Sequence, residues 1–177
     1  RAALVAEKSG ADSITIHLRE DRRHIRYYDL LNIKKKLKIP LNLEIAPTKE
    51  MLKIANKSKP NFVCIVPEKR KEITTEGGLN LYKNKKFLKK MIFALKKNKI
   101  KVSLFIEPQL PVVESAFILG ADSVELHTGS FCNLFNNQKK QFSEAEYNNL
   151  KQCAKYAKNF GLKVHAGHGL TYESTQV

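Results

Sequence analysis

The stretch that decides the fold reads GADSITIH at residues 10–17, and it returns in nearly the same form as GADSVELH at residues 120–127. Each copy has a glycine suited to end a helix, a short turn, and an alternating strand that ends in histidine. These two strands are the first and the fifth of the six that we expect. Equivalent units four strands apart are typical of an eightfold βα barrel built from two similar halves.

The rest of the chain alternates strand-like runs with helical patterns. We expect strands at 13–18, 41–45, 61–66, 101–106, 123–126 and 163–166. Helices are expected after a Thr48 cap, around 87–95, over 111–119, and from a capping box at 143–146 to Gly161. Alternation without hairpin signals favours parallel strands joined by helical crossovers. An open doubly wound sheet is the alternative, but it would usually carry a glycine-rich first βα turn, which is absent here.

The length of 177 residues, with 42% hydrophobic, suits one domain with a real core. A closed (β/α)8 barrel typically needs about 250 residues. The chain starts in a helix-like segment and ends soon after a strand. We therefore expect a single TIM-barrel domain over residues 1–177, α/β in class, with about six of eight βα units and with its first and last strands missing.

Composition narrows the setting and the partners. The sequence has no apolar run long enough to cross a bilayer and no signal-peptide apolar block at its start. Its three cysteines form no CxxC pair, which indicates a reducing, cytoplasmic location. The net charge is +15, and lysine outnumbers arginine 26 to 6. The scattered lysines fit a solvated surface, whereas four of the six arginines fall within residues 19–26, where bidentate cations could hold phosphate.

Three strands are expected to point ionisable side chains toward the barrel axis. Alternation places one set inward: Ser13, Thr15, His17 and Arg19 from the first strand, Asn42 and Glu44 from the second, and Glu125 and His127 from the fifth. The carboxyl ends of parallel barrel strands carry the active site. Buried charges are costly unless paired, so packing alone does not account for three such strands.

Three segments add candidate chemistry. Residues 17–24 combine two histidines with three arginines, a plausible phosphate and carbonyl site in which Glu20 and Asp21 could order the guanidinium forks. In residues 164–169, His168 can serve as general acid or base and Gly169 can offer an amide to phosphate. The pair His165 and His168 suggests a metal site, but residues three apart lie side by side on a helix and not on a strand. Residues 67–79 are long and polar and suit a lid.

Seven motifs, in order, resemble the pyridoxine 5′-phosphate synthase family. They are HLREDRRHI at 17–25, NLE at 42–44, VPEKR at 66–70, TTEGGL at 74–79, VSLFI at 102–106, ELHTG at 125–129 and AGHGL at 166–170. The resemblance implies a transferase-type synthase that condenses 1-deoxy-D-xylulose 5-phosphate with 3-amino-2-oxopropyl phosphate. It implies no redox cofactor, phosphorylated small-molecule substrates and a cytoplasmic homo-octamer. We expect neither nucleic acid nor a membrane as a partner.

The same resemblance assigns roles to individual residues. It implies acid–base roles for His17, Glu44 and His168, an active-site position for Glu125, and ligand-binding positions at Arg19, His24, Thr74 and Gly169. The sequence departs from the family pattern at His165, where asparagine is common. The family's substrate contacts from the first and last barrel strands have no counterpart in these residues.

Two other functions stay open at this point. One is a metal-dependent isomerase or hydrolase on a similar barrel, with Glu44, Glu125, His127 and His168 as ligands. The other is a nucleic-acid-binding module, which only the +15 charge suggests. No RNP, KH or helix-turn-helix pattern supports the second function.

Overall fold

The computed structural model describes residues 1–67, 77–137 and 140–177. Its helices are α1 (Ala2–Lys8), α2 (Tyr27–Lys36), α3 (Lys49–Ser58), α4 (Lys85–Lys97), α5 (Leu110–Leu119), α6 (Gly129–Asn136), α7 (Lys140–Asn159) and a 3-10 turn at Ser174–Gln176. Its strands are β1 (Ile14–His17), β2 (Leu41–Ile45), β3 (Phe62–Ile65), β4 (Lys101–Ile106), β5 (Ser123–His127) and β6 (Lys163–Gly167).

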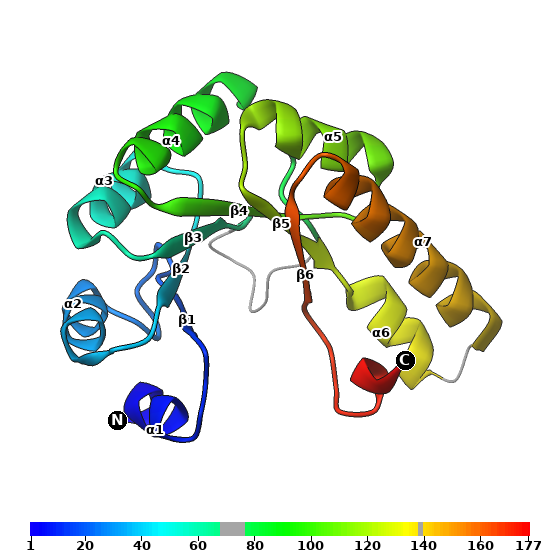
Figure 1. The fold of residues 1–177 in the computed structure, drawn as a ribbon, viewed down its shortest axis with the longest axis horizontal. Coiled ribbons are helices and arrows are strands. Elements are labelled where there is room, and N and C mark those ends of the chain that lie inside the picture. The colour runs from blue at the N-terminus through cyan, green and yellow to red at the C-terminus, as the bar shows by residue number, and fades with distance from the viewer. Residues whose placement is uncertain (68–76, 138–139) are drawn as a thin grey trace.

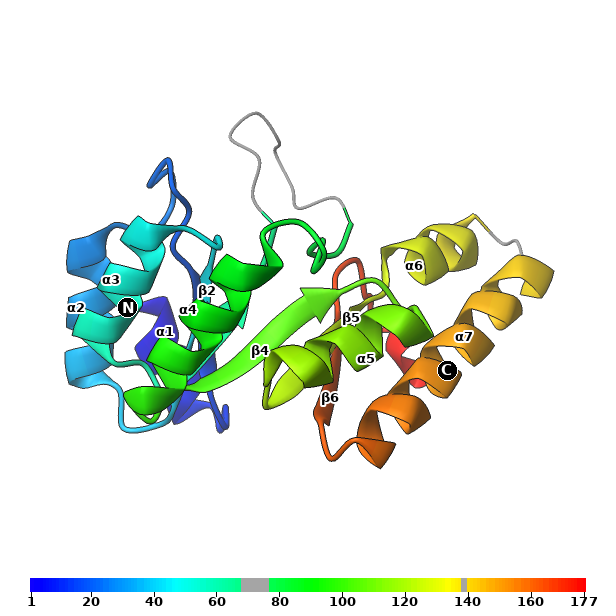
Figure 2. The same ribbon diagram turned by 90° about the horizontal axis from the view of Figure 1, so that it is seen from above.

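The strands form one parallel sheet in the sequential order β1 to β6. The sheet curls, and helices α2 to α5 and α7 follow its outer side (Figure 1). Figure 2, turned by 90°, shows α6 beside α7, with which it packs. The expected incomplete (β/α)8 barrel is therefore confirmed, and the open doubly wound alternative is not.

The core lies between the outer face of the sheet and the helices. Alternate strand residues such as Leu43, Leu104 and Val124 are fully buried, and they pack in one cluster with the apolar face of α4. Residues of α4 in that cluster include Met91 and Leu95, which the helical spacing had placed together. Burial of each such side chain stabilises the fold by about 1.5–3 kcal/mol. Because side chains alternate along a strand, the polar positions between them face the barrel axis.

The repeated segment has the same geometry in both copies. Gly10 and Gly120 have positive φ angles of 93° and 88°, which glycine adopts without strain. In each copy the glycine amide bonds the carbonyl three residues back, and the next amide bonds the carbonyl five residues back. This is the Schellman pattern of a helix end. The same helix end therefore aims both β1 and β5 into the sheet.

Three helices differ from the sequence expectations. The predicted capping box at Ser143 is wrong, because α7 begins at Lys140 and Ser143 lies inside it. The residues before Ser143 are ordinary helix formers, so the helix extends through a serine that costs it little. Helices α2 and α6 were not anticipated. The Thr48 cap is confirmed, since its side chain accepts a hydrogen bond from the Met51 amide.

Among the described residues, the helices are all too short or too polar to cross a membrane.

Candidate active site

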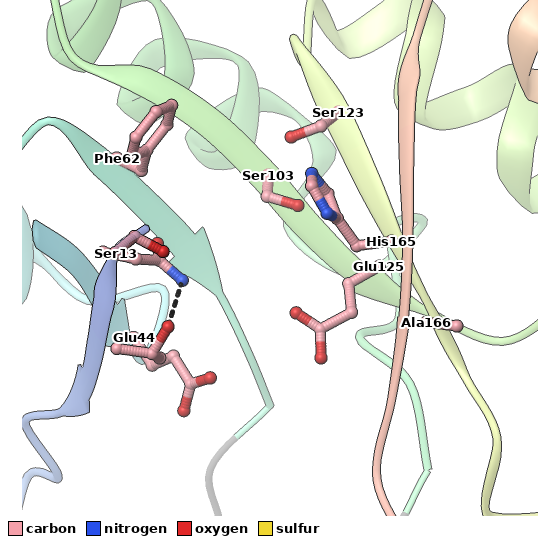
Figure 3. Close-up of a pocket in the computed structure, with 10 residues that line it drawn as sticks. Ser13, Glu44, Phe62, Ser103, Ser123, Glu125, His165 and Ala166 are labelled. Atoms are coloured by element: carbon pink, nitrogen blue, oxygen red, sulfur yellow. Dashed lines mark hydrogen bonds between the residues drawn. The ribbon is translucent and has the colours of Figure 1, made fainter. Parts of the chain in front are cut away.

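The inner face of the sheet carries the polar side chains that alternation had placed there. Glu44, Glu125 and His168 line a cavity of about 150 Å³ together with Val66 and Phe105. Figure 3 shows the carboxylates of Glu44 and Glu125 directed into the space enclosed by the curled sheet. Three groups capable of proton transfer thus converge from β2, β5 and the segment that follows β6.

His17 stands beside Glu44 because β1 and β2 pair in parallel with these two residues in register. The His17 Nδ1 and Glu44 Oε2 atoms lie 3.7 Å apart. Burial and the neighbouring Arg19 charge lower the pKa of His17 to about 4. Burial and the Glu125 carboxylate raise the pKa of Glu44 to about 7. Between these values both groups are mainly neutral, so the contact is not an ion pair at mildly acidic pH.

Glu125 is held by groups on either side of it. The Cys64 thiol donates to Glu125 Oε2 at 3.7 Å, and burial keeps the pKa of that thiol well above its usual value. Burial also raises the pKa of Glu125, while the thiol and His165 oppose the rise. His165, on β6, is the register neighbour of Glu125 and lines the inner face with it (Figure 3). The side chain that departs from the family pattern therefore lies beside Glu125 on the inner face.

His168 follows β6 with a positive φ angle of 84°, as does Gly169 with 81°. Thr128 fixes this bend, because its hydroxyl lies 2.7 Å from the carbonyl oxygens of both Gly167 and His168. Burial and the nearby His127 lower the pKa of His168. His168 is therefore a neutral imidazole at pH 7, able to accept one proton and to donate another.

The arginine-rich loop after β1 is ordered by carboxylates. Arg19 is only 6% exposed, and its Nε lies 3.6 Å from Asp21. Arg23 makes two closer contacts to the same carboxylate, of 2.7 and 2.6 Å. Arg22 donates to the Arg19 carbonyl oxygen and pairs with Glu50 of α3. Asp21 thus orders the forks as expected, and Glu50 is an additional partner that the local sequence did not suggest.

Two predicted ligand positions, His24 and Thr74, are not among the described residues that line the cavity of Glu44, Glu125 and His168. His24 is exposed and lines a separate hollow with residues of α1 and α2. Thr74 and most of the proposed lid, residues 68–76, lie outside the described residues.

The described part of the chain holds no group of three or more histidine, cysteine, aspartate or glutamate side chains placed to bind a metal ion. The four ligands of the metal-dependent alternative are divided between different neighbours. His127 pairs with Glu107 through Nδ1, whereas Glu125 pairs with Cys64.

Sequence reasoning missed three residues at the site: Cys64, Glu107 and Thr128. Alternation through 61–66 and 101–107 puts Cys64 and Glu107 on the inner face, so the signal was present. Thr128 carried no such signal, because its role depends on the carbonyls of a different strand end.

Comparisons with known proteins agree on one family. A model of the family described as pyridoxal phosphate biosynthesis protein PdxJ matches residues 1–177. A relative from Aquifex aeolicus, named pyridoxine 5′-phosphate synthase, is 50% identical over 175 residues, which are 99% of this chain and 72% of the relative. One of the same name from Pelagibacter ubique is 52% identical over 170 residues, 96% of this chain and 70% of the relative.

A solved structure with a similar fold is a phosphoribosyl anthranilate isomerase from Thermus thermophilus. Its TM-score is 0.61 at 14% identity, and the match covers 99% of this chain and 74% of that one. A HpcH/HpaI aldolase/citrate lyase family protein from Burkholderia cenocepacia has a TM-score of 0.58 at 13% identity, with 99% and 78% covered. At these identities the likeness concerns the fold alone.

Proposed function

The chain belongs to the pyridoxal phosphate biosynthesis protein PdxJ family, and we propose that it is a pyridoxine 5′-phosphate synthase. It condenses 1-deoxy-D-xylulose 5-phosphate with 3-amino-2-oxopropyl phosphate to pyridoxine 5′-phosphate, inorganic phosphate and water. The observation that carries this function is the convergence of Glu44, Glu125 and His168 on one cavity, with His17 against Glu44. Family membership supports the reaction, and the cavity supports the residue roles.

The acid–base roles follow from the protonation states at neutral pH. A pKa of about 7 leaves the Glu44 carboxyl close to half protonated, so it can take up and return protons without a large penalty. With a pKa of about 4, His17 is a neutral imidazole that can accept a proton. When an amine condenses with a ketone, the nitrogen loses protons and the carbonyl oxygen leaves as water. Ring closure adds further transfers at carbon, and His168 serves as the second donor and acceptor.

Phosphate binding is assigned to the loop after β1 and to the bend after β6. Arg19 is buried and oriented, so little side-chain entropy is lost when it meets a phosphate. Gly169 has no side chain to prevent close approach to its backbone. We assign His24 and Thr74 to ligand binding from the family motif.

The assembly and setting are also proposals. The synthase acts as a homo-octamer in the cytoplasm, on phosphorylated small molecules, and it needs no redox cofactor. Light scattering on the purified protein measures the first of these properties. A monomer or dimer at micromolar concentration would refute the octamer.

The test of function supplies both phosphorylated substrates to the purified full-length protein and measures pyridoxine 5′-phosphate. Glu44→Gln and His168→Asn are expected to abolish turnover and to keep the fold. The matched control is Glu114→Gln, which removes the same single negative charge as Glu44→Gln but at an exposed position on α5. It should behave as wild type. Absence of product from the wild type refutes the function. Activity lost to a chelator, with stoichiometric zinc or manganese bound, would favour the metal-dependent enzyme.

A further inference from the structure

A carboxylate–imidazole pair, Glu107 with His127, lies next to His168 and takes no part in the proton transfers proposed above. Glu107 directly follows β4, and His127 is the last residue of β5. The Glu107 Oε1 atom lies 3.0 Å from His127 Nδ1, within hydrogen-bonding distance. The His127 side chain is only 10% exposed, whereas that of Glu107 is 36% exposed. With Glu107 as a carboxylate, which can only accept, this contact places a proton on His127 Nδ1 and leaves Nε2 as an acceptor in the neutral ring.

The His127 ring is packed directly against His168. The two ring centroids are 4.9 Å apart, and Phe105 contacts both rings, at 5.3 Å from His127 and 6.3 Å from His168. The His127 Nε2 atom is buried and has no hydrogen-bond partner among the described residues. The His168 ring is thus packed against an imidazole whose own position is held by Glu107.

Gly129 shows how little room separates the two rings. A Cβ at this position would come within 2.6 Å of His127 Nε2 and 3.4 Å of His168 Cδ2. Gly129 begins α6 and its φ angle is not positive, so its backbone does not itself require glycine. The approach of the two imidazoles therefore accounts for the missing side chain.

Glu107 also contacts the described residues just before α4, at Gly78. Its Oε1 atom accepts a hydrogen bond from the Gly78 amide. Gly78 lies so close to the end of β4 that a Cβ there would meet the Glu107 amide nitrogen at 2.2 Å. At the next residue, the Leu79 amide donates a hydrogen bond to the Phe105 carbonyl oxygen at 2.7 Å. The same carboxylate oxygen thus contacts both the Gly78 amide and His127.

We propose that Glu107 and His127 are a pair of positioning residues, in which Glu107 holds His127 in its Nδ1–H form and His127 in turn orients His168 for proton transfer. Through Glu107, the pair also contacts the backbone amide of Gly78. The proposal rests on the proposed function only for the role of His168. Besides His127, the ionisable groups that share the small cavity with His168 are Glu44 and Glu125.

The first test reads the tautomer without any turnover. The chain has five histidines, so their ring nitrogens can be assigned by nitrogen-15 NMR on the labelled protein with single histidine variants. At pH 8 we expect the His127 proton on Nδ1 in the wild type, and a population with the proton on Nε2 in Glu107→Ala. The His168 ring signals should shift in the same variant. A wild-type His127 without a proton on Nδ1, or His127 and His168 signals unchanged in Glu107→Ala, overturns the pair.

The second test separates positioning from charge. A positioned general acid contributes about 100- to 10,000-fold, so we expect Glu107→Ala to lower kcat about 10- to 100-fold with KM within about twofold. Glu107→Gln keeps an oxygen that accepts the Nδ1 proton, and it should recover most of kcat. A kcat within twofold of wild type in Glu107→Ala, or equal losses in the two variants, refutes the positioning role. Glu114→Gln again serves as the control.

A third variant acts from the other side of the rings and leaves Glu107 in place. Gly129→Ala favours the helix by propensity, yet its methyl group must displace His127. We expect kcat to fall at least 10-fold with the melting temperature retained, whereas the exposed neighbour Ser130→Ala should behave as wild type. Normal turnover in Gly129→Ala contradicts the proposal. If the wild type forms no product, the proposed function fails, and the NMR test still decides the pair.

Discussion

Replacement of Glu44 by glutamine is expected to stabilise the protein at alkaline pH while it abolishes turnover. Burial and the Glu125 charge raise the pKa of Glu44 from 4.5 to about 7, and its side chain is only 26% exposed. A tenfold change in proton affinity is worth about 1.4 kcal/mol, so the ionised carboxylate costs the folded state about 3 kcal/mol above pH 7. Glutamine has nearly the same shape and carries no charge, so it removes this penalty.

The sign of the pH dependence follows from which state binds more protons. The folded pKa is raised, so the folded state holds the proton more tightly, and the associated stability is lost as pH rises from 4.5 through about 7. The Gln variant has no such loss. Its advantage in the free energy of unfolding should therefore grow by about 2 kcal/mol between pH 5.5 and pH 8.5. The opposite contribution of His17, with its lowered pKa, is present in both proteins and cancels.

Urea unfolding at the two pH values measures this difference. The control is Glu114→Gln, whose exposed carboxylate should give no gap that changes with pH. A gap between wild type and Glu44→Gln that stays constant, or that narrows as pH rises, would refute the view that a buried charge at Glu44 is maintained for function at the expense of stability.

Three further outcomes are expected. Glu125→Gln removes a charge that raises the pKa of Glu44, so the acidic limb of the pH profile of kcat/KM should move to lower pH. No movement would show that the limb belongs to another group. Gly167→Ala would place a methyl group 2.4 Å from Glu125 Oε1, so kcat should fall about 10-fold with little change in melting temperature. Asp21→Asn frees the Arg19 fork that it orders, so KM for the phosphorylated substrates should rise several-fold with kcat nearly constant.

Much of the fold could be predicted because its signals are local. Period-two alternation marked the strands and their inner faces, and the glycines at 10 and 120 marked helix ends, as the structure confirms. The predicted start of α7 was wrong, since a serine with a glutamate three residues later resembles a capping box but is also tolerated inside a helix. Helix α6 was missed because it is only eight residues long and opens with glycine one residue after β5. Helix α2 was missed as well.

By itself, the sequence determined which side chains face the barrel axis, since alternation along a strand is a property of the backbone of that strand. It therefore placed His17, Glu44 and Glu125 on one face. The tertiary structure alone decided which of them meet, because contacts such as Glu107 with His127 and Cys64 with Glu125 depend on strand register and on the curl of the sheet. The protonation of Glu44 was decided there as well, since burial and a neighbouring charge exist only after β2 and β5 have closed around the same cavity.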